Sequence, residues 1–287
     1  MANFDDVPLQ RPQEQDPRDE PGGLGPRFSV WVPIAIGLIV VAGIALWYLG
    51  SPAPDQEDTV VIQETTERVP AEAPIERGPA EPGDEIDLPP LDDTDALMRD
   101  LIARLSAHPR VMAYLTTDHL VRNMTVVVVN IADGKTPSGH LRTVRPTGDF
   151  QVTAEGRELV IDRRSYERYN DHAAAVQGLD ARGVARFYAT IRPRIDDAYR
   201  DLGSPHGDFD RSLERAIIEL LRTPIPEGDI RVRADSVAYT YDDADVESLS
   251  HAQRQFLRMG PDNMRIVKGK LREVAQHLGI PAASLPR

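Results

Sequence analysis

Two segments of the chain match each other at a distance of 80 residues: PTGDFQVTAEGRELVID at 146–162 and PEGDIRVRADSVAYTYD at 226–242. In each segment apolar residues alternate with polar ones on either side of a short turn, and this period of two is typical of a β-hairpin. A proline, a glycine and an aspartate also recur at equivalent positions. The match predicts two equivalent hairpins, which could share one sheet, in repeated units of helices followed by a hairpin. A chance likeness of two Gly-Asp turns is the alternative to a true duplication.

Most of the chain around the hairpins is predicted to be helical, because its apolar residues recur at intervals of three and four. The run Val126–Val129 is ambiguous, since valine favours strands. Leu120, Met124 and Ile131 keep the helical spacing, however, and Gly134 stands where a helix would end, so we predict a helix. The fold class is therefore α+β, predominantly α-helical with two β-hairpins. Other predictions are a helix capped by Asp92 or Asp93, a cap at Thr117 or Asp118 for the valine-rich helix, helices at 166–179 and 181–202, a helix capped by Asp208, and C-terminal helices at 250–279.

One stretch is apolar and long enough to cross a membrane: FSVWVPIAIGLIVVAGIALWYL, which runs from Phe28 to Leu49 without a charge. At about 1.5 Å per residue, a helix of this length spans the roughly 30 Å of hydrocarbon in a bilayer. A cleaved signal peptide has a basic start and a shorter apolar run, whereas the leader 1–27 carries six acids and three arginines. We therefore predict an uncleaved transmembrane helix that contacts the lipid bilayer through Phe28–Leu49.

The charges beside this helix predict its orientation. Arg27 lies directly before it, and the first basic residue after it is Arg68. Basic residues accumulate on the cytoplasmic side of membrane helices, so the N-terminus is predicted to be cytoplasmic in a bacterial inner membrane. The predicted parts are a disordered cytoplasmic tail at 1–27, the transmembrane helix at 28–49, a proline-rich acidic disordered linker at 50–90 and a periplasmic or otherwise extracytoplasmic domain at 91–287, with repeat-like halves at about 91–163 and 164–246.

The acidity of the chain belongs to its predicted tethers. The net charge is −13, of which the leader carries −3 and residues 50–90 carry −9, so residues 91–287 are left with −1. A nearly neutral domain lacks the basic face that nucleic-acid binding requires. We therefore predict no nucleic-acid partner. The absence of cysteine excludes disulfides and thiol catalysis.

The sequence contains no pattern that indicates a cofactor, a metal or a catalytic nucleophile. Its seven histidines have no metal-binding spacing, and the motifs of serine hydrolases and phosphate-binding loops are missing. Acids are plentiful, but acids at helix starts are usually caps. The domain is therefore predicted to be non-catalytic, and the alternative is a carboxylate-dependent envelope hydrolase whose two acids face a cleft between the repeat halves.

Four short motifs carry a resemblance to a known family: Leu88-Pro89-Pro90-Leu91-Asp92, Tyr199-x-x-Leu202-Gly203, Pro224-x-Pro226 and Leu257-Arg258-Met259-Gly260-Pro261-Asp262-Asn263. Over roughly 88–278 the sequence resembles a bacterial family of single-pass membrane proteins, the domain of unknown function 3014. The resemblance implies no activity, cofactor or catalytic residue.

Two places are candidate binding sites. The first is the corner between the last two helices, with Arg258 and Asn263, because a helix N-terminus beside an arginine can hold an anion; a capped helix corner is the alternative. The second is a stretch rich in tyrosine and arginine, the residues that dominate interface hot spots; core tyrosines with solvated arginines are the alternative. Its members are Tyr166, Arg168, Tyr169, Tyr188, Arg192, Arg194 and Tyr199. The predicted function is a binding or scaffolding module with a protein partner in the cell envelope.

Overall fold

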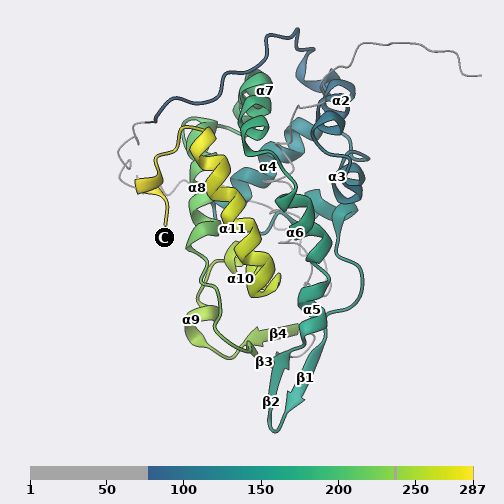
Figure 1. Ribbon diagram of the computed structural model, residues 1–287, viewed down its shortest axis with the longest axis vertical. Coiled ribbons are helices and arrows are strands. Elements are labelled where there is room, and N and C mark those ends of the chain that lie inside the picture. Colours follow the sequence, from purple (N-terminus) through teal and green to yellow (C-terminus); the bar gives the residue numbers. More distant parts are fainter. Residues whose placement is uncertain (1–76, 236–237, 287) are drawn as a thin grey trace, which may run out of the picture. The chain divides into compact units, whose positions relative to one another are not determined.

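The computed structural model describes residues 77–235 and 238–286. The predicted tail, the predicted transmembrane segment and residues 50–76 of the predicted linker lie outside this part. None of the helices that it contains is long and apolar enough to cross a membrane. The described chain is α+β, as predicted. Helices lie before, between and after two hairpins, which form one antiparallel sheet (Figure 1).

The helices make up most of the described chain, and their order is given by the residues that bound them. Before the first hairpin lie η1 (Leu91–Asp93), α2 (Asp95–Leu105), α3 (Pro109–Tyr114), α4 (Leu120–Ala132) and η2 (Ser138–Val144). Between the hairpins lie α5 (Arg163–Glu167), α6 (Asn170–Gln177), α7 (Ala181–Asp201) and α8 (Phe209–Arg222). The last hairpin is followed by α9 (Ala244–Glu247), α10 (His251–Leu257), α11 (Gly260–His277) and η3 (Ala282–Ser284).

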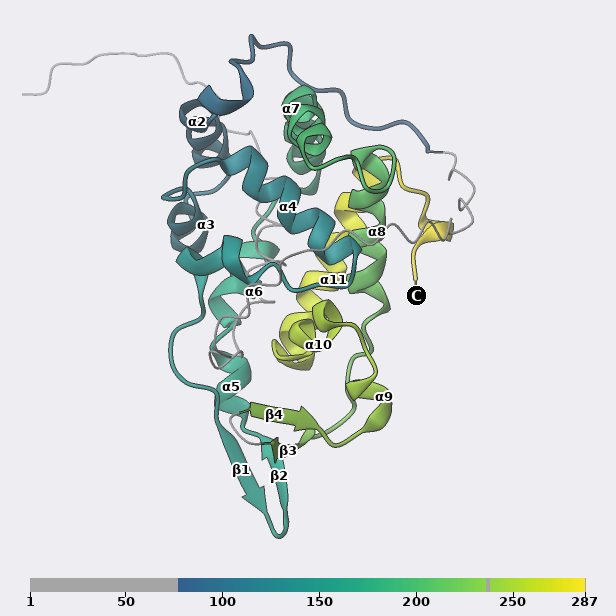
Figure 2. The same cartoon turned by 180° about the vertical axis from the view of Figure 1, so that it is seen from behind.

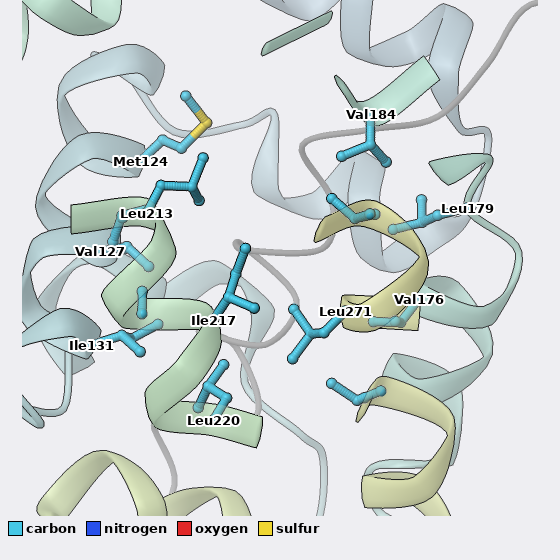
Figure 3. Packing of buried hydrophobic residues seen from close by; sticks show 14 of the residues in the cluster. Met124, Val127, Ile131, Val176, Leu179, Val184, Leu213, Ile217, Leu220 and Leu271 are labelled. Atoms are coloured by element: carbon cyan, nitrogen blue, oxygen red, sulfur yellow. The ribbon is translucent and has the colours of Figure 1, made fainter. Parts of the chain in front are cut away.

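The valine-rich segment is helical, as predicted, and forms α4 in the middle of the core. Its apolar side chains are at most 3% exposed from Leu120 to Ile131 along the buried face. Burying each such side chain stabilises the fold by about 1.5–3 kcal/mol, which exceeds the helix-propensity cost of a valine, below about 0.7 kcal/mol. Figure 3 shows the α4 face against α8, where Met124, Val127 and Ile131 lie beside Leu213, Ile217 and Leu220.

The start of α4 is capped from another helix, and the predicted cap at Thr117 or Asp118 is wrong. His119 occupies the N-cap position in a left-handed conformation, with φ 55°. The carboxylate of Asp95, in the first turn of α2, accepts hydrogen bonds from the backbone N–H groups of His119 (2.7 Å) and Leu120 (2.8 Å). The predicted cap of α2 at Asp92 or Asp93 is also wrong, because these residues form η1 and Thr94 takes the N-cap position.

The two predicted hairpins share one sheet, with strand order β1-β2-β3-β4. The strands are β1 (Val152–Glu155), β2 (Glu158–Ile161), β3 (Arg231–Asp235) and β4 (Ala238–Tyr241). Val152 pairs with Ile161 in the first hairpin, and Val232 pairs with Tyr241 in the second, so the registers agree at the 80-residue offset. Leu159 pairs with Val232 across the central pair of strands. The hairpins are therefore equivalent within the sheet, while duplication of the whole halves stays a prediction.

The helix predicted at 166–179 is instead two helices, α5 and α6, which meet at Arg168–Tyr169. Asp162 starts α5 earlier than predicted, because its side chain accepts a hydrogen bond from the N–H of Arg164. The break between the helices directs two tyrosines into different environments. Tyr166 packs against the small apolar cluster under the sheet, whereas Tyr169 is fully buried in the main helical core.

Residues 77–90, which were predicted to belong to the disordered linker, are ordered on the domain surface. This segment, here called the strap, runs along α7 without helix or strand structure of its own (Figures 1 and 2). Its backbone N–H groups bond to the carbonyls of Gly279 (from Gly78, 2.8 Å) and His277 (from Glu81, 3.1 Å). Composition predicted disorder because the strap has few apolar residues. Hydrogen bonds and ion pairs, instead of apolar contacts, hold the strap on the domain.

A buried lysine ends α8. Lys268 of α11 donates hydrogen bonds from Nζ to the carbonyls of Leu221 (3.0 Å) and Thr223. These carbonyls belong to the last turn of α8, where a cation is favourable. Burial lowers the pKa of Lys268 to about 8. The contact joins α11 to the C-terminal end of α8.

Candidate functional site

The structure divides the predicted binding residues into separate environments. The corner between α10 and α11 brings Asn263 to the end of α5, where its Nδ2 donates to the carbonyl of Tyr166 (3.1 Å). On α7, Tyr188 and Arg192 face α8. Tyr199, also on α7, is a core residue that is 2% exposed.

The side chains at the corner are bonded within the chain. Asn263 Nδ2 also donates to Asn170 Oδ1 (3.1 Å) and to the carbonyl of Met259 (3.0 Å). Arg258 donates to Gln255 Oε1 at 2.9 Å. Such contacts are those of a buried helix corner, and whether the corner also binds an anion stays a prediction.

Arg168 joins the same region to the sheet. Its Nε donates to the carbonyl of Ser165 (3.1 Å) and one terminal nitrogen donates to the carbonyl of Gly148 (3.1 Å). The guanidinium carbon lies 5.8 Å from the ring centroid of Phe150 and 5.6 Å from that of Tyr169. At these distances a guanidinium is attracted by the aromatic faces, so Arg168 fixes the entry of the first hairpin.

The α7 members of the predicted set are also engaged within the chain. The Tyr188 hydroxyl donates to Asp210 Oδ1 at 2.5 Å, and Arg192 donates to Oδ2 of the same carboxylate at 2.6 Å. Arg194 donates to Asp197 (2.6 Å) and to the carbonyl of Leu88 in the strap (2.9 Å). Burial raises the pKa of Tyr188 well above its ordinary value. These side chains therefore belong to two separate charged groups, one around Asp210 and one around Asp197, rather than to one open tyrosine-rich surface.

A pocket that the sequence did not predict lies between α4 and α7, with a volume of about 340 Å³. It is open to solvent, and exposed Leu202 (44%) lies at its rim. Its lining comes from η1, α4, η2 and α7. The lining residues are Asp92, His119, Arg122, Asn123, Val126, His140, Ala198 and Leu202.

Two polar side chains of the pocket hold each other in a defined orientation. Asn123 donates from Nδ2 to the carbonyl of Asp118 (2.7 Å), which leaves its Oδ1 to accept from His140 Nδ1 (2.8 Å). Because an amide oxygen can only accept, the proton of a neutral His140 ring lies on Nδ1 and Nε2 is an acceptor. Burial lowers the pKa of His140 below its ordinary value, so the ring is neutral at pH 7.

The charges of the pocket are balanced locally. Arg122 bonds to Asp201 (2.6 Å) on one side and to Asp92 (2.9 Å) on the other. Hydrogen bonds to these two carboxylates raise the pKa of Arg122, so its guanidinium is a fixed charge held between them. The His119 ring has no hydrogen-bond partner among the described residues and is exposed. The pocket can therefore offer donors, acceptors and an apolar wall to a small polar group.

The lining of the pocket holds a single carboxylate. Asp92 is its one carboxylate, and it is already paired with Arg122. Hydrolysis by carboxylates needs two acids facing one substrate. Across residues 77–235 and 238–286, no group of three histidine or acidic side chains could hold a metal ion. The pocket was not predicted because it forms where η2 folds back onto α4. The spacing of single histidines in the sequence does not indicate that contact.

The sequence of the helical domain identifies the family of this chain. Residues 120–275, more than half of the sequence, match the family described as protein of unknown function (DUF3014). The chain belongs to this family. No curated protein and no solved structure matches it. The DUF3014 match runs from α4 almost to the end of α11, so it includes both hairpins and every lining residue of the pocket except Asp92 and His119, while the strap precedes it.

Proposed function

We propose that this DUF3014 protein is a single-pass inner-membrane protein whose extracytoplasmic domain is a non-catalytic binding or scaffolding module with a protein partner in the cell envelope. The uncharged stretch 28–49 supports the anchor, and Arg27 supports a cytoplasmic N-terminus. A tether from the membrane holds such a module at high effective concentration near other proteins of the same bilayer.

The pocket between α4 and α7 is the observation that carries the binding function. Its polar groups are fixed by Asn123 and His140, and its apolar rim is exposed at Leu202. Exposed apolar surface beside oriented donors and acceptors is what a partner side chain needs in order to dock. The rival proposal, a carboxylate-dependent hydrolase, requires a second acid, and the α4–α7 pocket does not supply one.

The proposed topology is tested with a reporter enzyme that is active only outside the cytoplasm. Fused after Arg287, the reporter is expected to be active, whereas the same reporter fused before Met1 is expected to be inactive, because the positive flank at Arg27 stays in the cytoplasm. The measurement is reporter activity in intact cells that carry equal amounts of each membrane-inserted fusion. Activity of the N-terminal fusion alone would reverse the orientation.

Binding through the pocket is tested by replacing Leu202 with glutamate in the full-length chain. The residue is exposed, so the fold should persist, but a charge at the rim should reduce recovery of cross-linked envelope proteins about tenfold, since a buried charge without a partner is costly. Met112 is a matched control, because it is an apolar residue of similar exposure (41%) on α3. Recovery that is equal for Leu202→Glu, Met112→Glu and the parent chain would remove the pocket from the proposal.

The arginines of α7 offer a less direct test. The sequence identifies Arg192 and Arg194 as candidate contacts of a partner, so their joint replacement by alanine should weaken recovery of that partner. Since Arg194 bonds to Leu88 of the strap and Arg192 bonds to Asp210, the double variant would also loosen the strap. A partner surface at these arginines therefore stays a proposal that needs a strap control.

A further inference from the structure

The N-terminal end of the strap is held by charged contacts of Arg77. One terminal nitrogen of Arg77 lies 3.0 Å from Asp210 Oδ1, and the other donates to the backbone carbonyl of Asp210 at 2.7 Å and lies 3.6 Å from Glu214 Oε2. The side chain of Arg77 is 26% exposed and that of Asp210 is 14% exposed. The contact is therefore partly desolvated, and such charge-assisted bonds are stronger than surface ion pairs.

The receiving side is a built acidic niche, formed by Asp210 and Glu214 of α8 and Tyr188 of α7. The Glu214 side chain is only 9% exposed, and its Oε1 is buried with no hydrogen-bond partner among the described residues. Burial raises the pKa of Glu214. The other oxygen of this carboxylate, Oε2, faces the guanidinium of Arg77 at 3.6 Å, so the niche receives a cation from outside α7 and α8.

The strap is also recognised by shape. A Cβ atom on Gly83 would lie 2.6 Å from the backbone nitrogen of Thr190 and 2.7 Å from the carbonyl carbon of Ala189. The strap backbone therefore touches the α7 backbone directly, and only glycine fits at this position. The N–H of Asp84 donates to Thr190 Oγ1 at 2.9 Å. Recognition thus requires an arginine and, six residues later, a glycine.

The middle of the strap is held by ion pairs. The Glu81 carboxylate lies 3.1 Å from Arg182 Nε on α7 and 3.3 Å from His277 Nδ1 on α11. These partners, like Thr190 and Asp210, lie about 100 residues or more from the strap in the sequence. Residues 77–84 of the strap therefore lie against a surface formed by α7, α8 and α11, and its remaining residues 85–90 join them to the rest of the domain.

We propose that this surface of α7, α8 and α11 is a recognition site for the segment 77–84 and that two copies of the chain exchange this segment, so that Arg77 of one copy binds Asp210 and Glu214 of the other. An exchanged segment keeps every contact of the closed form, which makes this a low-cost route to a dimer. The site is separate from the α4–α7 pocket and does not depend on the function proposed for it.

The length of chain before the strap favours a second copy as the partner. Residues 50–76 separate Arg77 from the proposed anchor at 28–49. A segment of this length reaches about 30 Å as a flexible coil and about 84 Å as a polyproline II helix. Copies anchored in one bilayer within this distance present identical straps to identical recognition surfaces at high effective concentration.

The test uses the absence of native cysteine. Full-length chains with Asp84→Cys and with Thr190→Cys, each with a tag of different size, are co-expressed and treated in membranes with a short bis-maleimide cross-linker. Neither chain can cross-link within itself at this contact. We expect a heterodimer about tenfold above the yield obtained when the Asp84→Cys chain also carries Gly83→Val, which prevents docking of the strap on α7.

A synthetic peptide of residues 77–90 should compete with this cross-link, and the same peptide with Arg77→Ala should compete about tenfold less well, because it lacks the guanidinium. The double variant Asp84→Cys/Thr190→Cys reports the closed form, since its cross-link is intrachain. Intrachain cross-linking of the double variant together with a heterodimer yield no higher than that of the Gly83→Val control would overturn the proposal.

Discussion

Replacement of Gly260 by alanine is expected to lower the free energy of unfolding by about 3 kcal/mol. Gly260 starts α11 with φ +78°, a left-handed conformation that costs an L-residue roughly 1–2 kcal/mol. The added Cβ would also lie 2.5 Å from Cγ and 2.8 Å from Cδ1 of Tyr166. Tyr166 packs against the cluster under the sheet, so its ring cannot move aside without disturbing that packing. The measurement is urea denaturation of the full-length chain, followed by circular dichroism.

Gly269 provides the matched control on the same helix. A Cβ atom at this position meets no other atom within 4 Å. Alanine there removes the entropic cost of a helical glycine and should leave stability unchanged or raise it by about 0.5–1 kcal/mol. Equal behaviour of the Gly260→Ala and Gly269→Ala variants would show that the corner between α10 and α11 tolerates a side chain, and the argument from Tyr166 would fail.

Local patterns in the sequence predicted the elements that depend on neighbouring residues. Helical spacing identified α4 despite its valines, and alternation identified both hairpins. Asp208 caps α8 as predicted, and Ser250 caps α10 at the start of the predicted C-terminal helices; each side chain accepts a hydrogen bond from the N–H group three residues later. These outcomes share one cause, which is that the interacting groups lie within about ten residues of each other in the chain.

Apart from the sheet shared by the two hairpins, contacts between distant segments were not predicted. Asp95 caps α4 from 24 residues away, which no local motif records. The strap was assigned to the linker because its composition is polar, yet Gly83 meets α7 about 100 residues later in the chain. Composition measures how much apolar surface a segment can bury, and it does not measure how many hydrogen bonds a folded surface offers to that segment.

The candidate site shows the same limit. Tyrosine and arginine content indicated a surface, but the structure places Tyr199 in the core, where its hydroxyl bonds to Ser212 Oγ at 3.0 Å. The pocket, by contrast, depends on His140 meeting Asn123 across a fold in the chain. Residue type alone cannot separate a tyrosine that binds another protein from a tyrosine that is hydrogen-bonded inside its own core, because the hydroxyl needs a hydrogen-bond partner in both cases.

Replacement of Asn263 by aspartate is expected to lower the free energy of unfolding at pH 7 by about 3 kcal/mol or more, although the two side chains have nearly equal volume. Asn263 is 6% exposed, and its Nδ2 lies 3.0–3.1 Å from three oxygen atoms. Three acceptors around one atom identify it as the amide nitrogen. An aspartate would bring an oxygen to this place. The amide of Asn170 can turn to donate, but the carbonyls of Tyr166 and Met259 cannot.

The pH dependence separates this charge effect from simple loss of packing. A buried carboxyl facing acceptors has a folded-state pKa raised above its unfolded value of about 3.9, because protonation supplies a donor. The deficit relative to the parent chain should therefore be smallest at acid pH and should grow as the pH rises through the folded-state pKa. Asn263→Ala loses the same hydrogen bonds without gaining a charge, so its deficit, about 1–3 kcal/mol, should not vary with pH. Urea denaturation at a series of pH values measures both variants. An aspartate variant whose deficit is constant with pH would mean that water reaches this corner and solvates the carboxylate, and Asn263 could then be available to a ligand after all.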